Sequence, residues 1–274
     1  MNSSAAHPRA SLFLTTYEML RHLELVLAGL GRQSVRDFEV LLCDDGSGPE
    51  TRQAIDAWVA RTAQPLQYFW QEQKGFRKCR ILNEALRAAR GDTLIFLDGD
   101  CIPHRHYIKD HLEQQEIGCY LAGRRVNLGE QLSQSLTPAD IDAGLLDGPG
   151  FRLLQASRTG QIDHLQRTLR VPFRPLRKLL GMTQVDDLLG SNYSVSRQDL
   201  TAINGFDEAY EGYGREDTDA ELRLQNMGLK IKSMKGLALQ FHVWHPRRAF
   251  TPANDNRLEL VKQSGKVRCE RGAW

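Results

Sequence analysis

Two aspartates separated by one glycine follow an apolar run in the segment TLIFLDGDCIPH, residues 93–104. The run is predicted to be a buried strand, so Asp98 and Asp100 lie where that strand meets solvent. Carboxylates placed there are costly unless a cation or a positively charged side chain binds them. The spacing therefore predicts a site for a hard divalent cation that shares its other positions with water and phosphate oxygens. The alternative is a tight turn in which an aspartate caps the next helix.

A second pair of carboxylates lies in CDDGSG, residues 43–48. Asp44 or Asp45 at the end of a strand suits recognition of a ribose hydroxyl or a base N–H, although a capped turn explains the pair as well. Arg77 and Arg80, in GFRKCR, present forked donors that match carboxylate or phosphate, and a solvent-facing helix is the alternative. Asn83 lies one turn beyond Arg80 on the same predicted helix.

A third group of acids lies in EGYGREDTDAELRL, residues 211–224. Glu216 and Asp217 open a predicted helix, where acids interact favourably with the helix dipole for purely structural reasons. The glycines before them, however, let the backbone approach a ligand closely. An acid raised towards neutrality by crowded neighbours is also a suitable general base. We therefore favour a base or an acceptor ligand at these two positions.

Two histidines, His242 and His245, end an apolar run in QFHVWHP. A single histidine is more often a core or surface residue than a ligand. Two of them beyond a strand, in a chain that already has carboxylates at strand ends, predict that one completes the metal site. Nitrogen, carboxylate and phosphate oxygen together suit Mn²⁺ better than Ca²⁺, with Mg²⁺ as the alternative.

The elements that must position these residues alternate between strands and helices. The predicted strands are 11–16, 38–43, 66–70 and 93–97. Three helices are expected between them, the last one ending at Gly91. This alternation is typical of an α/β protein with a mostly parallel sheet flanked by helices. Because ligands bind beyond the carboxyl ends of such strands, we expect the aspartates of the second and fourth strands to share one rim.

The composition excludes several classes of protein. The chain has 274 residues, 41% of them apolar and 26% charged, as in a soluble globular protein, and its net charge of +2 gives no support to nucleic-acid binding. Its apolar runs fall short of the roughly 20 residues that a membrane helix needs. Residues 1–11 lack the apolar centre of a secretory signal. The five cysteines form an odd, scattered set, which predicts reduced thiols and a cytoplasmic location.

Together these segments resemble the GT-A glycosyltransferases of family 2, a family of inverting nucleotide-sugar enzymes. The resemblance rests on SLFLTTYEMLRHLELVLAGLGRQ, FEVLLCDDGS, RILNEALRAARGDTLIFLDGD and GSNYSVSR…GFDEAYEGYGREDTDAELRL. The last segment is also similar to the C-terminal motif of galactosyltransferases and chondroitin-polymerase-like enzymes. The resemblance implies transfer of Gal, GalNAc, GlcNAc or Glc from a UDP-sugar to a hydroxyl of a glycan or lipid-linked acceptor in cell-surface polysaccharide synthesis.

The resemblance also implies a role for each matching residue. Asp98 would contact ribose or a metal-bound water, and Asp100 would bind the metal together with His242 or His245. Asp217 would be the base, and Glu216 would orient the acceptor or the donor sugar. The nucleotide-sugar site would comprise Thr15, Thr16, Tyr17, Asp44, Asp45, Arg77, Arg80, Asn83, Asp98 and Gly99. The acceptor site would comprise Tyr213, as a stacking wall, Gly214 and Asn192.

The chain divides into four segments on this basis. The predicted parts are a nucleotide-sugar half at 10–126, a variable insertion at 127–184, an acceptor and catalytic half at 185–246 and a basic tail at 247–274. Residues 152–178 carry seven Arg or Lys and one acid. This excess predicts peripheral contact with an anionic membrane, at the inner face of the plasma membrane, where lipid-linked acceptors reside. A solvated insertion that binds the acceptor is the alternative.

Other functions use related patterns. HAD-type phosphatases also place two spaced aspartates after an apolar strand, but on their first strand. A nucleotidyltransferase that forms the sugar nucleotide would need a glycine-rich phosphate loop after the first strand, and TTYEMLRHLE lacks one. A non-catalytic module that binds nucleotide sugars stays open as an alternative, although the acids at 216 and 217 and the two histidines argue against it.

Overall fold

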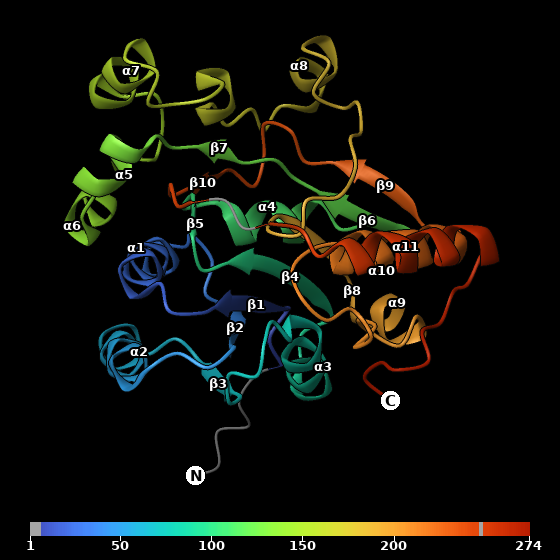
Figure 1. The fold of residues 1–274 in the computed structure, drawn as a ribbon. Coiled ribbons are helices and arrows are strands. Elements are labelled where there is room, and N and C mark those ends of the chain that lie inside the picture. The colour runs from blue at the N-terminus through green and yellow to red at the C-terminus, as the bar shows by residue number, and fades with distance from the viewer. Residues whose placement is uncertain (1–6, 247–248) are drawn as a thin grey trace.

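Parallel strands from the first hundred residues form one half of the main sheet (Figure 1). The computed structural model describes residues 7–246 and 249–274, and within them this sheet has seven strands in the order β3-β2-β1-β4-β8-β6-β9. The strands are β1 (Ala10–Thr16), β2 (Phe38–Asp44), β3 (Leu66–Trp70), β4 (Thr93–Asp98), β6 (Cys119–Ala122), β8 (Tyr193–Ser196) and β9 (Lys230–Ser233). The four predicted strands are confirmed, each within one residue of its expected bounds.

Helices cover both faces of this sheet, as the strand–helix alternation predicts. On one face lie α1 (Leu20–Gly31) and α2 (Pro49–Thr62), and on the other lie α3 (Lys78–Ala88), α9 (Arg197–Ala202) and α10 (Glu216–Asn226). Successive side chains of β1 alternate between the two cores, so that Leu12 and Leu14 pack below α1 while Phe13 packs below α3. The Trp58 indole donates a hydrogen bond of 2.7 Å to the Leu27 carbonyl and so joins α2 to α1.

A stack of aromatic rings joins the parallel strands β1 and β4 to the antiparallel strand β8. The rings of Phe13 and Phe96 lie 4.8 Å apart, and those of Phe96 and Tyr193 lie 4.3 Å apart and nearly parallel. All three side chains are buried. Replacing a buried phenylalanine by alanine costs about 3–5 kcal/mol, so this stack contributes strongly to holding β8 against β4. It thereby fixes the strand end that carries Asp98.

A second, smaller sheet brings distant parts of the chain to the same edge. It contains β5 (Cys101–Pro103), β10 (Gln240–His242) and β7 (Val126–Asn127), in the order β5-β10-β7. β10 runs antiparallel to β5, with His242 opposite Cys101, and parallel to β7, with His242 opposite Asn127. This register places His242 next to the residue that follows Asp100.

The segment 127–184 lacks the strand–helix alternation of the first hundred residues. Its short helices are α5 (Glu130–Ser135), α6 (Pro138–Asp142), α7 (Phe151–Arg158), the 3₁₀ helix η1 (Leu165–Thr168) and α8 (Arg174–Leu179), and α4 (Tyr107–Gln114) precedes it. Pro175 lies in the first turn of α8, where the missing N–H is harmless, so it starts this helix rather than breaking it. Within the described residues, the helices are too short or too polar to cross a membrane.

One expectation about a helix end was wrong. Gly91 does not cap α3, which ends at Ala88; it lets the chain pass β1, because a Cβ at Gly91 would lie 2.3 Å from the Ala10 carbonyl carbon. The basic tail contains a helix, α11 (Pro252–Ser264), which contacts α10. Residues 247–248 of this tail lie outside the described residues. So do residues 1–6, on which the expectation about a secretory signal partly rests.

Candidate active site

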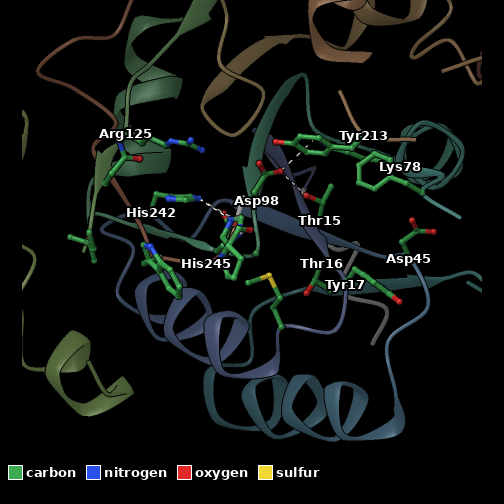
Figure 2. A pocket seen from close by; sticks show the side chains of 18 of the residues that line it. Thr15, Thr16, Tyr17, Asp45, Lys78, Asp98, Arg125, Tyr213, His242 and His245 are labelled. Atoms are coloured by element: carbon green, nitrogen blue, oxygen red, sulfur yellow. Dashed lines mark hydrogen bonds and ion pairs between the residues drawn. The ribbon is translucent and has the colours of Figure 1, made fainter. Parts of the chain in front are cut away.

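A cavity of about 850 Å³ opens at the carboxyl ends of β1 and β4, next to the smaller sheet (Figure 2). Its volume is in the range of a site for a small molecule or cofactor. The predicted residues that line it are Thr15, Thr16, Tyr17, Asp45, Asp98, Gly99, Asp100, Tyr213, His242 and His245. Lys78, Arg125 and Phe250 also line it and were not predicted. The shared rim expected from the strand pattern is therefore present.

Asp100, His242 and His245 form a cluster suited to a metal ion. Their ligand atoms all lie within 4.8 Å of one another. Asp100 Oδ2 is 3.1 Å from His245 Nε2 and 3.8 Å from His242 Nε2, and the two Nε2 atoms are 3.2 Å apart. Because β10 pairs with β5, residues about 140 positions apart in sequence meet here. The donor set of one carboxylate and two imidazoles fits a divalent transition ion such as Mn²⁺.

The protonation states of this cluster also favour cation binding. Burial lowers the pKa of His242 to about 4, so its ring is neutral at pH 7. Burial alone would raise the pKa of Asp100, but a hydrogen bond with His245 and the positive charge that His242 carries at low pH hold that pKa well below its usual range. A neutral imidazole and an ionised carboxylate are the forms that bind metal.

Asp98 points away from this cluster. The β1–β4 register sets Thr15 opposite Asp98, and the Thr15 hydroxyl donates a hydrogen bond of 2.8 Å to Asp98 Oδ1. The same oxygen lies 3.7 Å from Lys78 Nζ. The metal cluster in the described residues thus includes Asp100 and not Asp98, and contact of Asp98 with ribose or a metal-bound water stays a prediction.

Lys78 connects the acids that the sequence placed in separate groups. Its Nζ lies 3.4 Å from Glu216 Oε1, 3.4 Å from Asp217 Oδ2 and 3.7 Å from Asp98 Oδ1. Burial alone would lower the pKa of Lys78, but these three carboxylates raise it well above its ordinary value. Sequence reasoning considered Arg77 on one side of it and overlooked Lys78. The acids at 98 and at 216–217 needed a positively charged partner, and this need could have pointed to Lys78.

The pKa of Asp217 lies well above that of an ordinary aspartate. Burial raises the pKa of Asp217 to about 7, Lys78 acts against this shift, and the charges of Glu216 and Asp98 add to it. Its carboxylate fits against Gly190, where an ideal Cβ would lie 1.8 Å from Asp217 Oδ2. A carboxylate that titrates near pH 7 has the proton affinity expected of a general base at physiological pH.

Glu216 lies behind Lys78 and is only 4% exposed. Its Oε1 faces Lys78, and its Oε2 is buried without a hydrogen-bond partner in the described part of the chain. The geometry therefore lets Glu216 influence the cavity through Lys78, rather than through direct contact with a sugar. The role predicted for it, orienting the acceptor or donor sugar, becomes an indirect one.

The nucleoside residues predicted after β1 and β2 separate into two sets. Thr15, Thr16 and Tyr17 line the cavity, as does Asp45, which accepts hydrogen bonds from Gln71 Nε2 at 2.6 Å and from the Arg77 backbone N–H at 3.0 Å. Asp44 is fully buried, and its two oxygens accept from Ser47 and from the Tyr68 hydroxyl. The carboxylate of Asp44 thus caps a turn, which was the alternative interpretation of this pair, and it does not reach the cavity.

Two predicted amide ligands are structural instead. Asn83 has no exposed surface, and both ends of its amide bind the backbone of Phe206. Asn192 is equally buried, and its amide binds the carbonyls of Arg124 and Ala238 and the ring of His111. In both cases a buried backbone needed a hydrogen-bond partner, and neither side chain reaches the cavity.

The two predicted arginines lie outside the cavity, whereas the tyrosine predicted to form the acceptor wall lines it. Arg77 and Arg80 do not line the cavity; Arg77 binds the Glu72 carbonyl, and Arg80 is exposed on α3. Tyr213 does line it, and its ring lies 5.7 Å from that of Phe76 and 5.4 Å from that of Phe250. These rings make an aromatic wall of the kind on which sugar rings stack.

Gly214 shapes this wall instead of contacting a ligand. Its φ is +101°, and an ideal Cβ there would lie 2.3 Å from Phe250 Cδ1. Only glycine combines this backbone conformation with room for the Phe250 ring. The acceptor-binding role predicted for Gly214 therefore reduces to making space for an aromatic residue that does line the cavity.

Two families match the sequence. Glycosyl transferase family 2 matches residues 11–171, and the family described as the N-terminal domain of galactosyltransferase matches residues 174–246. Validoxylamine A glucosyltransferase of Streptomyces hygroscopicus subsp. jinggangensis is 25% identical over 245 residues, which are 84% of this chain and 55% of that protein. Chondroitin synthase of Escherichia coli is 24% identical over 246 residues, 85% of this chain and 34% of that protein. The chain spans about half the length, or less, of these curated relatives.

Solved structures identify the fold. GalNAc-T7, whose crystal structure contains UDP, GalNAc and Mn²⁺, superposes with a TM-score of 0.65 and 15% identity over 94% of this chain and 48% of that one. The expected α/β GT-A fold is confirmed by this likeness and by the mostly parallel sheet flanked by helices. Since the family 2 match covers more than half of the sequence, the chain belongs to glycosyl transferase family 2.

Proposed function

We propose that the chain is a metal-dependent, inverting glycosyltransferase that moves a sugar from a UDP-sugar to a hydroxyl of a glycan or lipid-linked acceptor. One observation carries the proposal: the cavity is lined both by the Asp100–histidine cluster and by Lys78, which contacts the carboxylate of Asp217. A departing diphosphate needs a bound cation, and a nucleophilic hydroxyl needs a base such as the carboxylate of Asp217. The similarity to a chondroitin synthase supports a role in polysaccharide synthesis.

Asp100, His242 and His245 would hold the cation of this reaction. A divalent ion bound there supplies positive charge to the diphosphate as it leaves. Two of the three side chains have the protonation state that binds metal, because His242 is neutral and Asp100 is ionised at pH 7. Mn²⁺ is the proposed ion, and Mg²⁺ is the alternative.

Asp217 would be the base. It accepts the proton of the acceptor hydroxyl while that oxygen forms a bond to the anomeric carbon. The bond from the anomeric carbon to the β-phosphate oxygen breaks on the opposite face, and its electron pair leaves with UDP, so the configuration inverts. Lys78 holds the Asp217 carboxylate in place, and Glu216 holds Lys78 from behind.

The two ends of the cavity would bind the two substrates. Thr15, Thr16, Tyr17 and Asp45 are proposed to hold the uridine, with Asp98 on the ribose. Tyr213 offers its ring to the acceptor sugar, supported by Phe76 and Phe250. Gal, GalNAc, GlcNAc and Glc are the proposed donor sugars.

The experiment that tests this function measures UDP release. The full chain is incubated with each UDP-sugar and a panel of glycan and lipid-linked acceptors, with Mn²⁺, with Mg²⁺ and with EDTA. We expect acceptor-dependent UDP release with one donor and its loss in EDTA, because the cation cluster is then empty. Pyrophosphate release from added UTP and a sugar 1-phosphate, without UDP release from the donor, would indicate the nucleotidyltransferase instead. Binding of a UDP-sugar without any release would indicate the non-catalytic module.

We further propose peripheral contact with an anionic membrane, at the cytoplasmic face of the plasma membrane, through α7 and α8. Figure 1 places these helices on the same side of the molecule, beyond β7. Phe151 is 80% exposed and Leu179 81% exposed, and the exposed basic residues Arg174 and Lys178 lie on α8. Large exposed apolar side chains beside basic ones are typical of surfaces that lie in a lipid interface.

Not all of the basic residues counted in the sequence are available for lipid. Arg177 is buried and donates to the Lys235 and Ser233 carbonyls, and Arg170 is paired with Asp110. The charge that faces outward is therefore smaller than the sequence suggests. Membrane contact would then depend on insertion of apolar side chains into the lipid as well as on charge. The test therefore changes an apolar side chain and varies the salt concentration.

The membrane contact predicts cosedimentation with anionic vesicles. The wild type is expected to pellet with phosphatidylglycerol vesicles at low salt, and to do so less at high salt or with neutral phosphatidylcholine. Leu179→Glu should reduce the bound fraction several-fold, because it places a carboxylate in the interface. Ile117→Glu, at a fully exposed apolar residue outside the insertion, is the matched control. Equal pelleting of all three proteins would contradict the contact.

A further inference from the structure

Arg125 is a basic residue in the cavity wall that neither the sequence nor the proposed mechanism accounts for. It immediately precedes β7, whose Val126 is buried opposite Phe241 of β10. Alternation along the strand puts Arg125 and Asn127 on the same face, and both line the cavity. In Figure 2 the Arg125 side chain lies beside His242 and extends across the cavity towards Asp98.

The guanidinium of Arg125 forms no hydrogen bond or ion pair with any residue in the described ranges 7–246 and 249–274. Its neighbour Arg124 is different, because Arg124 Nε lies 2.8 Å from Asp186 Oδ2. Among the residues that the structure describes, Lys78 is the other Lys or Arg that lines the cavity, and it already faces three carboxylates. A partly buried guanidinium with five donors and no partner is costly, which points to a ligand that pairs with it.

Arg125 lies in a part of the wall that is rich in carboxylates. The cavity contains the carboxylates of Asp45, Asp98 and Asp163, beside that of Asp100. These carboxylates repel an anion, and the positive charge of Arg125 offsets part of that repulsion.

We propose that Arg125 binds the diphosphate of the nucleotide donor, on the side facing His242, and that it holds the β-phosphate as UDP leaves. The inference rests on the proposed function. A guanidinium presents paired N–H donors that match two phosphate oxygens, and such charge-assisted bonds are stronger than neutral ones.

Arg125 would interact more strongly with the departing UDP than with the bound UDP-sugar. The diphosphate of a UDP-sugar carries two negative charges, and UDP gains a third as the bond to the sugar breaks. A fixed cation next to the β-phosphate therefore interacts more strongly with the leaving group than with the donor. Arg125 would be a residue that binds the diphosphate and lowers the barrier to its departure.

The test compares nucleotides that differ only in phosphate. Calorimetry with UDP, UMP and uridine is performed on the wild type, Arg125→Gln, Arg125→Lys and the control Arg124→Gln, each with and without Mn²⁺. Arg125→Gln should weaken UDP binding about 10- to 100-fold, as expected for loss of a charge-assisted hydrogen bond, while uridine binding is unchanged. Arg125→Lys should fall between the two, and Arg124→Gln should match the wild type.

The outcomes separate the two proposals. If the wild type binds neither UDP nor uridine in Mn²⁺, the proposed function fails. If the wild type binds UDP and Arg125→Gln binds it equally well, the diphosphate role is wrong while the function stands. An equal loss of UDP and uridine binding in Arg125→Gln would also overturn the role, because it indicates a distorted cavity. Should Arg125→Gln not fold, Arg125→Lys decides by the same UDP-to-uridine comparison.

Discussion

Asp217→Asn is expected to slow sugar transfer by about two to four orders of magnitude while UDP binding stays within a factor of two or so of the wild type. General-base catalysis by a positioned carboxylate contributes a rate factor of that size. Asparagine keeps the shape of the side chain against Gly190 and removes its ability to accept a proton. Initial rates at saturating donor and acceptor, with UDP affinity measured separately, check the expectation. A wild-type rate in Asp217→Asn would exclude it as the base.

Asp219, two residues further on the same helix, provides the contrast. Its carboxylate is buried and lies 2.6 Å from Arg223, which also binds the carbonyls of Ile203 and Gly205. Breaking such a buried pair costs about 3–5 kcal/mol of stability. Asp219→Asn should therefore lower the thermal midpoint and leave the rate per folded molecule close to normal. Asp217→Asn should instead lower the rate and leave the thermal midpoint close to normal.

The pH dependence of transfer follows from the pKa of Asp217. The base must be ionised, and its pKa is about 7, so kcat/KM should rise with pH through 7 and level off above it. Lys78 opposes the raised pKa, so Lys78→Met removes that opposition and should move the rising limb to higher pH. Profiles of kcat/KM from pH 5.5 to 9 check both statements. A limb unchanged in Lys78→Met would mean that another group sets it.

Asp100→Asn is expected to weaken Mn²⁺ binding by at least about 100-fold, with a matching loss of transfer at limiting metal. Outer-shell changes at metal sites already cost 10- to 100-fold, and Asp100 supplies the carboxylate of the cluster itself. Mn²⁺ titration followed by electron paramagnetic resonance, without nucleotide, measures the affinity directly. An unchanged affinity in Asp100→Asn would remove the cluster as the metal site.

Separate variants of the two histidines decide which of them binds the ion. His242→Gln and His245→Gln should each weaken Mn²⁺ binding if both are ligands, and only one will do so if a single imidazole is used. His22→Gln is the matched control, because its ring lies 6.5 Å from that of His245 while its Nε2 faces the Trp244 carbonyl. His22→Gln should bind Mn²⁺ as the wild type does.

The sequence predicts those site residues whose position follows from the strand pattern. Asp98, Asp100 and Asp45 follow strands, and the carboxyl ends of parallel strands meet at one edge. The pair at 44 and 45 shows the limit of this argument. Asp44 is the last residue of β2 and turns into the protein to bind Tyr68, while Asp45, the next residue, faces the cavity. Composition alone cannot distinguish the two.

Residues whose role depends on distant partners could not be predicted in this way. Lys78 becomes important only because Glu216 and Asp217 fold against it, and Arg125 only because β7 pairs with β10. Conversely, Asn83 and Asn192 have the residue type of a ligand but satisfy buried backbone groups. A polar side chain in a sequence does not state whether a substrate or the protein itself uses its hydrogen bonds.

The small sheet has a consequence for how the protein matures. Asp100 lies between β4 and β5, but His242 and His245 follow some 140 residues later and join it only when β10 pairs with β5 and β7. A ribosome that has made the first 200 residues has thus produced one of the three residues of the candidate metal cluster. Manganese added during refolding should report the last long-range pairing of the chain rather than its early collapse.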